Sequence, residues 1–267
     1  MRKLLTNLCI PTGGDTTAAR EILIVDGRIA EITPAAEKPA DRSADRPAES
    51  DVDVIDLKGC LLLPGVIDGH VHFDDPGFTH RENFETGTRA AAAGGVTCVV
   101  DMPCTSLPPV TSVAGLRAKL AVIEPKAHID FMLWGGVSDN AMGEPNWREE
   151  LEAIVGEGVA AIKVYMLSGM DTFRDLSRLQ IREVLVETRR LGIPVGVHAE
   201  DREMVRGLEA RFRNEGREEP LDYAASRPGA AEVSAVEAVR DLCRETGARV
   251  HIVHLASGRA LEVVGEA

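Results

Sequence analysis

The chain has 267 residues, of which 44% are hydrophobic and 27% are charged, which is the composition of an ordinary globular protein and excludes a disordered or fibrous one. Its formal net charge of -13 argues against a nucleic-acid partner or an anionic membrane surface, since either would need clustered Lys and Arg. No apolar run approaches the roughly 20 residues of a membrane span, and the five scattered cysteines contain no C-x-x-C pair, so we expect a cytoplasmic protein with reduced thiols.

Short strands are predicted in the N-terminal part of the chain, at residues 4–10, 21–25, 28–32 and 52–57. The second and third of them flank Asp26-Gly27, a dipeptide typical of a β-hairpin turn. Residues 34–50 are rich in Pro, Ala and charge, and they predict a solvated loop. We therefore assign residues 1–58 to a small β-sandwich domain.

From residue 59 onward, apolar runs suited to buried parallel strands alternate with helical stretches. The predicted strands are 61–73, 96–102, 129–135, 160–167, 194–199 and 249–256. The predicted helices are 82–93, 147–155, 176–191 and 231–246. Six β/α units in succession predict an α/β fold, either a doubly wound sheet or a (β/α)8 TIM-type barrel. A closed barrel needs eight strands, so we expect residues 59–267 to form a barrel that is incomplete at its C-terminus.

Two histidines end the first strand of this region, in the run Asp68-Gly69-His70-Val71-His72. Because side chains alternate faces along a strand, His70 and His72 point the same way and could supply half of a metal site. A His-x-His pair is weak evidence by itself, since surface pairs of this kind are common.

The fourth strand carries Lys163 between Ile162 and Val164. A buried lysine is unfavourable unless something compensates its charge. Lys163 could extend to the rim or pair with an acid. Alternatively, a depressed pKa would let its amine react with carbon dioxide and give a carbamate, an anion able to bridge two cations.

Further histidines lie in strands five and six. Strand five ends Val197-His198-Ala199-Glu200, and strand six contains both His251 and His254. His251 and His254 are three residues apart and face opposite sides of the strand, and His254 lies nearer the C-terminal mouth. We therefore predict that His254 is a metal ligand and that His251 is a packed or hydrogen-bonded outer residue. Four histidines at the same end of three strands, beside the lysine of strand four, are hard to attribute to chance.

Five stretches of the sequence resemble the amidohydrolase superfamily, specifically its cyclic-amidase branch of dihydroorotases, allantoinases and hydantoinases. They are PGVIDGHVHFDDPG at 64–77, TGTRAAAAGGVTCVVDMP at 86–103, AIKVYM at 161–166, VHAE at 197–200 and HIVHLAS at 251–257. The resemblance implies a (β/α) barrel with two divalent metal ions, usually zinc. His70 and His72 would hold one ion and His198 and His254 the other, and carboxylated Lys163 would bridge them.

The same resemblance implies hydrolysis of a cyclic amide by a hydroxide that bridges the two metal ions, in a homo-oligomer. In the family, the general base is an Asp after strand eight. The sequence ends before that strand, so the catalytic residue is unknown, and we expect the chain to be a fragment of a longer protein. The competing interpretation is a non-catalytic scaffold related to dihydroorotases, although the presence of all five metal-type residues argues against it.

Two positions distinguish members of this branch. Dihydroorotases have Arg where Asp74 stands and Asn where Cys104 stands, and an Asp repels a carboxylate substrate. The stretches that look more like allantoinase are 168–173, 197–201 and 222–228, the last followed by Glu232. We therefore expect allantoin or a related ureide or hydantoin as substrate, with dihydroorotate as the alternative. The candidate substrate contacts are Asp74, Cys104 and Ser168.

Overall fold

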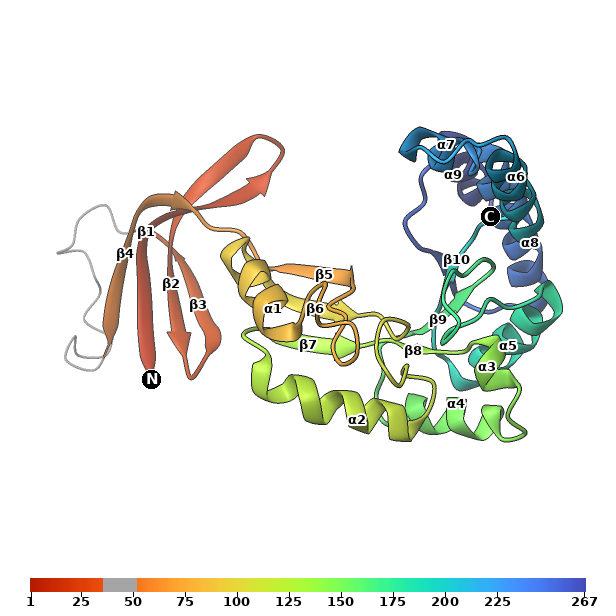
Figure 1. Ribbon diagram of the computed structural model, residues 1–267. Helices are drawn as coiled ribbons and strands as arrows, with labels where there is room; N and C mark the ends of the chain where they lie inside the picture. The colour runs from red at the N-terminus through yellow and green to blue at the C-terminus, as the bar shows by residue number, and fades with distance from the viewer. Residues whose placement is uncertain (36–51) are drawn as a thin grey trace. The chain divides into compact units, whose positions relative to one another are not determined.

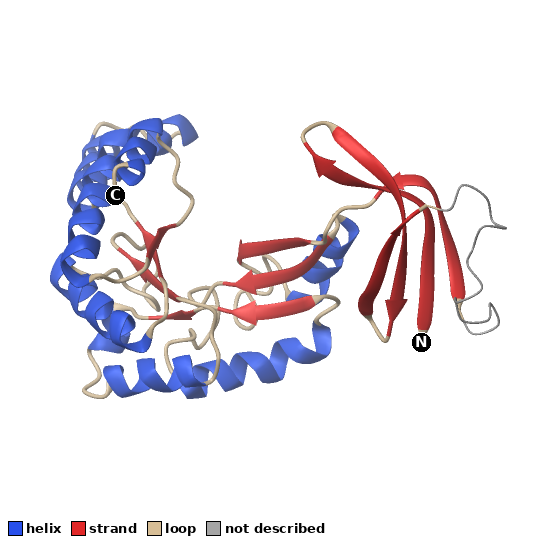
Figure 2. Ribbon diagram, turned by 180° about the vertical axis from the view of Figure 1, so that it is seen from behind, coloured by secondary structure: helices blue, strands red, loops and turns tan. Residues whose placement is uncertain are grey.

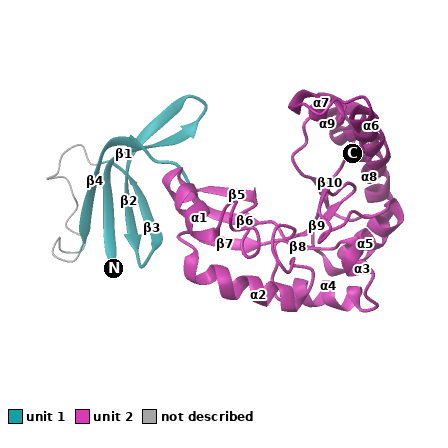
Figure 3. Ribbon diagram, in the orientation of Figure 1, with its two compact units in different colours: residues 1–65 teal, residues 66–267 magenta. Residues whose placement is uncertain are grey.

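The computed structural model describes residues 1–35 and 52–267. It divides into two compact units, Met1–Gly65 and Val66–Ala267 (Figure 3). Of the loop predicted at 34–50, only Pro34, which ends a strand, and Ala35 are described, and the remainder lies outside the described residues.

The first unit contains one four-stranded sheet with the order β3-β2-β1-β4 (Figure 1). Its strands are β1 (Arg2–Gly13), β2 (Thr16–Val25), β3 (Arg28–Pro34) and β4 (Asp53–Leu61). The predicted hairpin joins β2 to β3, where Asp26 and Gly27 have φ values of 50° and 77°. Positive φ at both central positions is the type I′ geometry that Asp-Gly favours. Because the described part of this unit forms a single sheet, the second layer of a sandwich stays a prediction.

The second unit is an α/β structure with two parallel sheets (Figure 2). One has the order β5-β6-β7 and the other β8-β9-β10-β11, so the order in space follows the order in the chain. A doubly wound sheet reverses its order at a switch point, whereas a barrel does not. The arrangement is therefore consistent with part of a TIM-type barrel. The strands are β5 (Val66–Val71), β6 (Val96–Asp101), β7 (Asp130–Leu133), β8 (Gly135–Gly136), β9 (Ile162–Tyr165), β10 (Val195–His198) and β11 (Val250–Ile252).

All six predicted strands of this unit are present, but most are shorter than predicted. The sixth ends at Ile252, so His254 lies in the turn that follows the strand and not within it. The first is shorter than predicted, because residues 62–65 only connect β4 to β5. The third is divided at Trp134 into β7, which pairs with β6, and β8, which pairs with β9. This segment therefore continues from one sheet into the other.

Helices follow most of these strands. They are α1 (Phe84–Ala93), α2 (Val113–Ile123), α3 (Asp139–Met142), α4 (Trp147–Gly156), α5 (Arg178–Leu191), α6 (Arg202–Asn214), α7 (Pro220–Ala225), α8 (Gly229–Thr246) and α9 (Gly258–Gly265), with a 3-10 turn at Glu124–Lys126. The four predicted helices are confirmed as α1, α4, α5 and α8, whereas α2, α3, α6, α7 and α9 are not among the predicted ranges. Within the described ranges, none of the helices combines the length and the apolar character that crossing a membrane requires.

The burial of the central strands of the second unit explains the uninterrupted apolar runs in its sequence. Ile162 and Val164 on β9, and Val195 and Val197 on β10, are completely buried. A parallel strand covered on both faces needs apolar side chains at successive positions rather than at alternate ones. Lys163 lies between Ile162 and Val164, so its side chain points to the opposite face of the sheet, where it is also completely buried.

Trp134 links the two sheets below the strand ends. Its indole Nε1 donates a hydrogen bond to the Gly69 carbonyl oxygen over 3.0 Å, directly before His70. The ring lies against the backbone of Gly196 on β10, where a Cβ atom would stand 2.6 Å from Cζ3 of the tryptophan. The absence of a side chain at Gly196 therefore makes room for the ring that supports β5.

A buried ion pair connects α2 to the end of β6. Lys119 Nζ lies 2.6 Å from Asp101 Oδ2, and both side chains are completely buried. The other carboxylate oxygen of Asp101 accepts a hydrogen bond from Phe73 N over 2.8 Å. Burial raises the pKa of Asp101, and Lys119 opposes that effect. The pair therefore fixes the backbone that follows His72.

We expect Lys119→Met to destabilise the protein by about 3–5 kcal/mol, because it leaves the Asp101 carboxylate buried without a counter-charge. The double variant Lys119→Met/Asp101→Asn should recover most of this loss. Arg117 lies on the same helix as Lys119 and forms an exposed ion pair with Glu157, so it provides the matched control. Arg117→Met should cost less than about 1 kcal/mol. Urea unfolding measures all three, and equal losses for Lys119→Met and Arg117→Met would contradict the assignment.

Candidate metal centre

Six side chains from the strand ends of the second unit form a closed series of contacts, here called the histidine circuit. Its members are His72, His70, His254, His198, Tyr165 and Cys104. Successive ring centroids are 5.3 Å apart for His72–His70, 5.5 Å for His70–His254, 4.7 Å for His254–His198 and 4.9 Å for His198–Tyr165. The Tyr165 hydroxyl lies 3.2 Å from Cys104 Sγ, which lies 3.9 Å from His72 Nδ1 and closes the circuit. The structure thus brings together the four histidines that the sequence assigned as ligands.

The imidazole nitrogens of the circuit face each other in two pairs. His70 Nε2 and His72 Nε2 are 3.3 Å apart, and His198 Nδ1 and His254 Nε2 are 3.0 Å apart. Two nitrogens bound at 2.0–2.1 Å to one tetrahedral zinc ion are separated by about 3.3 Å. The spacing of both pairs therefore fits two ligands of one ion. Within the described part of the chain, no three His, Cys, Asp or Glu side chains form a group that could hold a metal ion, so each pair needs a further donor.

Three histidines of the circuit are neutral at pH 7. Desolvation lowers the pKa of His70 to about 3 and those of His72 and His254 to about 4, and the positive charge of Lys163 contributes in each case. These imidazoles therefore carry a free lone pair at neutral pH. A metal ion can bind them without first displacing a proton from a charged ring.

Lys163 lies beside the circuit in the middle of β9. Its side chain is completely buried, and across the sheet it is paired with Gly136 on β8 and Gly196 on β10. Its Nζ lies 4.7 Å from the Tyr165 ring centroid and has no hydrogen-bond partner among the described residues. Burial lowers its pKa to about 8. In the described part of the chain, this amine thus neither reaches solvent nor pairs with an acid.

The three candidate substrate contacts differ in their surroundings. Asp74 is buried in the left-handed region at φ 56°, and its Oδ1 has no hydrogen-bond partner among the described residues. Cys104 is also buried, which raises the pKa of its thiol, and it contacts Tyr165 as a neutral group. The Ser168 hydroxyl donates to the Phe173 carbonyl oxygen over 2.7 Å and accepts from Met170 N over 3.1 Å. The Ser168 hydroxyl proton is therefore engaged in a hydrogen bond within its own loop.

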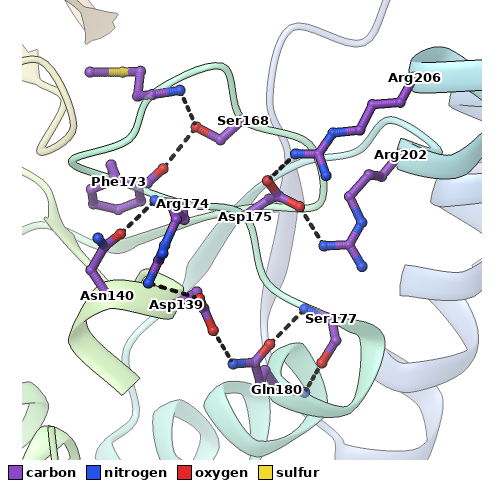
Figure 4. Close-up of polar contacts among 11 residues, drawn as sticks. Asp139, Asn140, Ser168, Phe173, Arg174, Asp175, Ser177, Gln180, Arg202 and Arg206 are labelled. Carbon is purple, nitrogen blue, oxygen red and sulfur yellow. Dashed lines mark hydrogen bonds and ion pairs between the residues drawn. The ribbon is translucent and has the colours of Figure 1, made fainter. Parts of the chain in front are cut away.

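The loop between β9 and α5 is held by polar contacts on both sides (Figure 4). On one side, Asn140 accepts from Arg174 N over 2.8 Å and donates to the Asp171 carbonyl oxygen over 3.0 Å. On the other, the buried Asp175 carboxylate pairs with Arg206 over 2.7 Å and also with Arg202. Because α6 supplies both arginines, the helix after β10 fixes the loop after β9.

Three further residues contact the histidines and had not been assigned to the site. Tyr165 stacks on His198, Thr105 Oγ1 lies 3.2 Å from His72 Nδ1, and Glu200 Oε2 lies 3.1 Å from His198 Nε2. Tyr165 and Glu200 each follow an assigned residue by two positions, so strand alternation could have indicated them. Thr105 comes from the loop after β6, and no local pattern indicates it. His251 lies on β11 and is exposed, so the prediction that its side chain packs is wrong.

The fold and the donor set define a parallel α/β protein with a candidate two-metal centre. The chain belongs to the amidohydrolase family, which residues 61–267 match. It is 42% identical over 214 residues to an allantoinase of Rubrobacter xylanophilus, covering 80% of this chain and 46% of that protein. It is 38% identical over 265 residues to an allantoinase of Solibacter usitatus, covering 97% of this chain and 54% of that protein.

Solved structures give the same result for the fold. The L-hydantoinase (dihydropyrimidinase) from Arthrobacter aurescens has a TM-score of 0.85 and 26% sequence identity, covering 99% of this chain and 55% of that one. The dihydropyrimidinase from Brevibacillus agri has a TM-score of 0.84 and 30% identity, covering 100% of this chain and 54% of that one. The chain thus spans about half the length of the relatives it matches.

The depressed pKa of Lys163 gives the metal-free protein a pH dependence of known sign. Its pKa is about 8 when folded and 10.5 when unfolded, so between these values the unfolded chain binds more protons and stability rises with pH. We expect a rise of at most about 3 kcal/mol from pH 8 to pH 10.5. Chemical unfolding with a chelator present measures it, and the rise should be absent in Lys163→Met. An identical pH profile in the variant would show that Lys163 is not the group responsible.

Proposed function

We propose that the protein hydrolyses a cyclic amide, opening the ring of allantoin or of a related ureide or hydantoin. The observation that carries this proposal is the pairing of four imidazoles beside a buried lysine amine that has no hydrogen-bond partner among the described residues. The allantoinase and hydantoinase names of the relatives support the substrate class. The closed eight-stranded barrel and the N-terminal β-sandwich belong to the same proposal.

The residues of the circuit fit two divalent ions, which we take to be zinc. His70 and His72 would hold one ion, and His198 and His254 the other. A carboxylated Lys163 would supply the oxygen donors that each histidine pair lacks. When bound, such ions supply Lewis acidity towards an amide carbonyl and make water acidic near neutral pH.

The surroundings of Lys163 favour its carboxylation. With its pKa lowered to about 8, part of the amine is unprotonated near neutral pH and can act as a nucleophile. The nitrogen lone pair attacks the carbon of carbon dioxide and a proton leaves to water, so the product is a carbamate anion. Gly136 and Gly196, which flank Lys163 in the sheet, bring no side chain beside it.

Asp74 supports a ureide over an acidic substrate. A buried carboxylate with one oxygen unpartnered within the described residues can accept hydrogen bonds from the N–H groups of a ureide or hydantoin. The same carboxylate repels a substrate carboxylate, such as that of dihydroorotate.

We expect the purified protein to hold about two zinc ions per chain and Lys163→Ala to lose them, because both histidine pairs lose their shared donor. Elemental analysis measures the metal, and circular dichroism checks the fold. Added propionate or formate should restore part of the metal content and part of the activity, since a free carboxylate can replace the carbamate. Full metal retention in Lys163→Ala would refute the bridging role, and absence of metal in the unaltered protein would favour a scaffold.

A panel of four ring substrates tests the specificity. We expect ring opening of allantoin to be fastest, hydantoin and dihydrouracil to be slower, and dihydroorotate to be inert. Asp74→Asn removes the repelling charge but keeps an acceptor, so it should lower kcat/KM for allantoin by less than Asp74→Leu does. Turnover of dihydroorotate alone would overturn the ureide assignment, and faster hydantoin turnover would replace allantoin with hydantoin.

A further inference from the structure

His198 contacts a carboxylate on the side of its ring that faces away from His254. Glu200 Oε2 lies 3.1 Å from His198 Nε2, while His198 Nδ1 lies 3.0 Å from His254 Nε2. An ionised carboxylate can only accept, so His198 Nε2 carries the proton and Nδ1 carries the lone pair. Glu200 thereby determines which nitrogen of His198 faces the metal position.

Glu200 is itself held by an arginine from a distant part of the chain. Arg227 Nε lies 3.9 Å from Glu200 Oε1, and Arg227 Nη2 donates to Glu209 Oε1 over 2.6 Å. The guanidinium lies over the Tyr223 ring, 3.7 Å from its centroid. A planar cation fixed between two carboxylates and an aromatic face has little freedom to move. Arg227 thus places a positive charge beside the Glu200 carboxylate oxygen that does not contact His198.

The backbone around His254 depends on a second carboxylate. His254 has φ 41°, in the left-handed region that a histidine seldom adopts. Glu232, in the first turn of α8, accepts from Ala256 N over 2.8 Å and from Ser257 N over 2.6 Å. Two charge-assisted hydrogen bonds two and three residues after His254 hold the chain in this conformation.

The first turns of α8 also reach the end of β10. Asp201 N donates to the Ala231 carbonyl oxygen over 3.0 Å, and Ser234 donates to Asp201 Oδ2 over 2.9 Å. The same part of one helix therefore holds the chain just after His198 and just after His254.

We propose that Glu200, Arg227 and Glu232 are positioning residues for the histidine pair His198–His254. Glu200 fixes the tautomer of His198, Arg227 holds Glu200, and Glu232 holds the backbone of His254. The proposal rests on the proposed function, in which this pair binds one of two ions. It gives a role to the 222–228 segment and Glu232, whose sequence looks like that of allantoinases.

The test uses Glu200→Gln, Arg227→Met and Glu232→Gln, with Glu245→Gln and Arg182→Met as controls from an exposed ion pair. Competition between zinc and a chelator measures the affinity for each of the two ions. We expect the three site variants to weaken one ion by about 10- to 100-fold and to leave the other within about twofold. The controls should bind both ions as the unaltered protein does.

Nitrogen NMR of the histidines in the metal-free protein provides a readout that does not depend on metal. We expect His198 to be protonated on Nε2 in the unaltered protein. In Glu200→Gln, the amide can donate to that nitrogen, so a share of His198 should move to the Nδ1-protonated form. Glu200→Gln is nearly isosteric, so loss of fold should not obscure the result.

The two readouts separate this proposal from the proposed function. If the unaltered protein binds no zinc, the function fails, but the tautomer of His198 still tests the role of Glu200. An unchanged tautomer in Glu200→Gln would overturn the inference, as would equal weakening of both ions in all three site variants.

Discussion

A fully buried lysine amine without a hydrogen-bond partner in the described structure is the feature on which the rest of the second unit depends. Such a group opposes folding, because a charged amine loses its hydration and a neutral one still loses its hydrogen bonds to water. The surrounding structure makes the neutral form accessible by lowering the pKa of Lys163 to about 8. Its charge also helps to keep the neighbouring imidazoles unprotonated. The unfavourable burial of Lys163 thus lowers the pKa of its own amine and contributes to the lowered pKa of the neighbouring histidines.

The rigidity of the site comes from the layer outside the histidines. Asp101 and Lys119 hold the backbone after His72, and Trp134 holds the carbonyl before His70. On the opposite side of the circuit, carboxylates act on His198 and on the chain after His254. For His70, His72 and His254 these groups come from other strands or helices, whereas Glu200 lies two residues after His198. Such outer contacts commonly decide whether metal ligands keep their geometry when no ion is present.

The sequence predicted those parts of the molecule that follow from local periodicity. Six strand positions, the Asp26-Gly27 hairpin and the common face of His70 and His72 all follow from alternation and turn chemistry. The helix α6 was missed although Val205, Leu208 and Phe212 recur at helical spacing, and it is held partly by ion pairs from Arg202 and Arg206 to Asp175. Contacts across the fold, such as Thr105 with His72 and Arg227 with Glu200, leave no local signal. They become visible only when the strand ends are assembled.

The lack of a side chain at Gly196 affects the position of residues in the other sheet as well as local packing. Any larger residue there would push against Trp134, whose indole supports Gly69 one position before His70. A substitution on β10 would thus displace the backbone of β5, which belongs to the other sheet. Substitutions at residue 196 and at residue 134 are therefore coupled, so a position outside the histidine circuit constrains the backbone that carries His70.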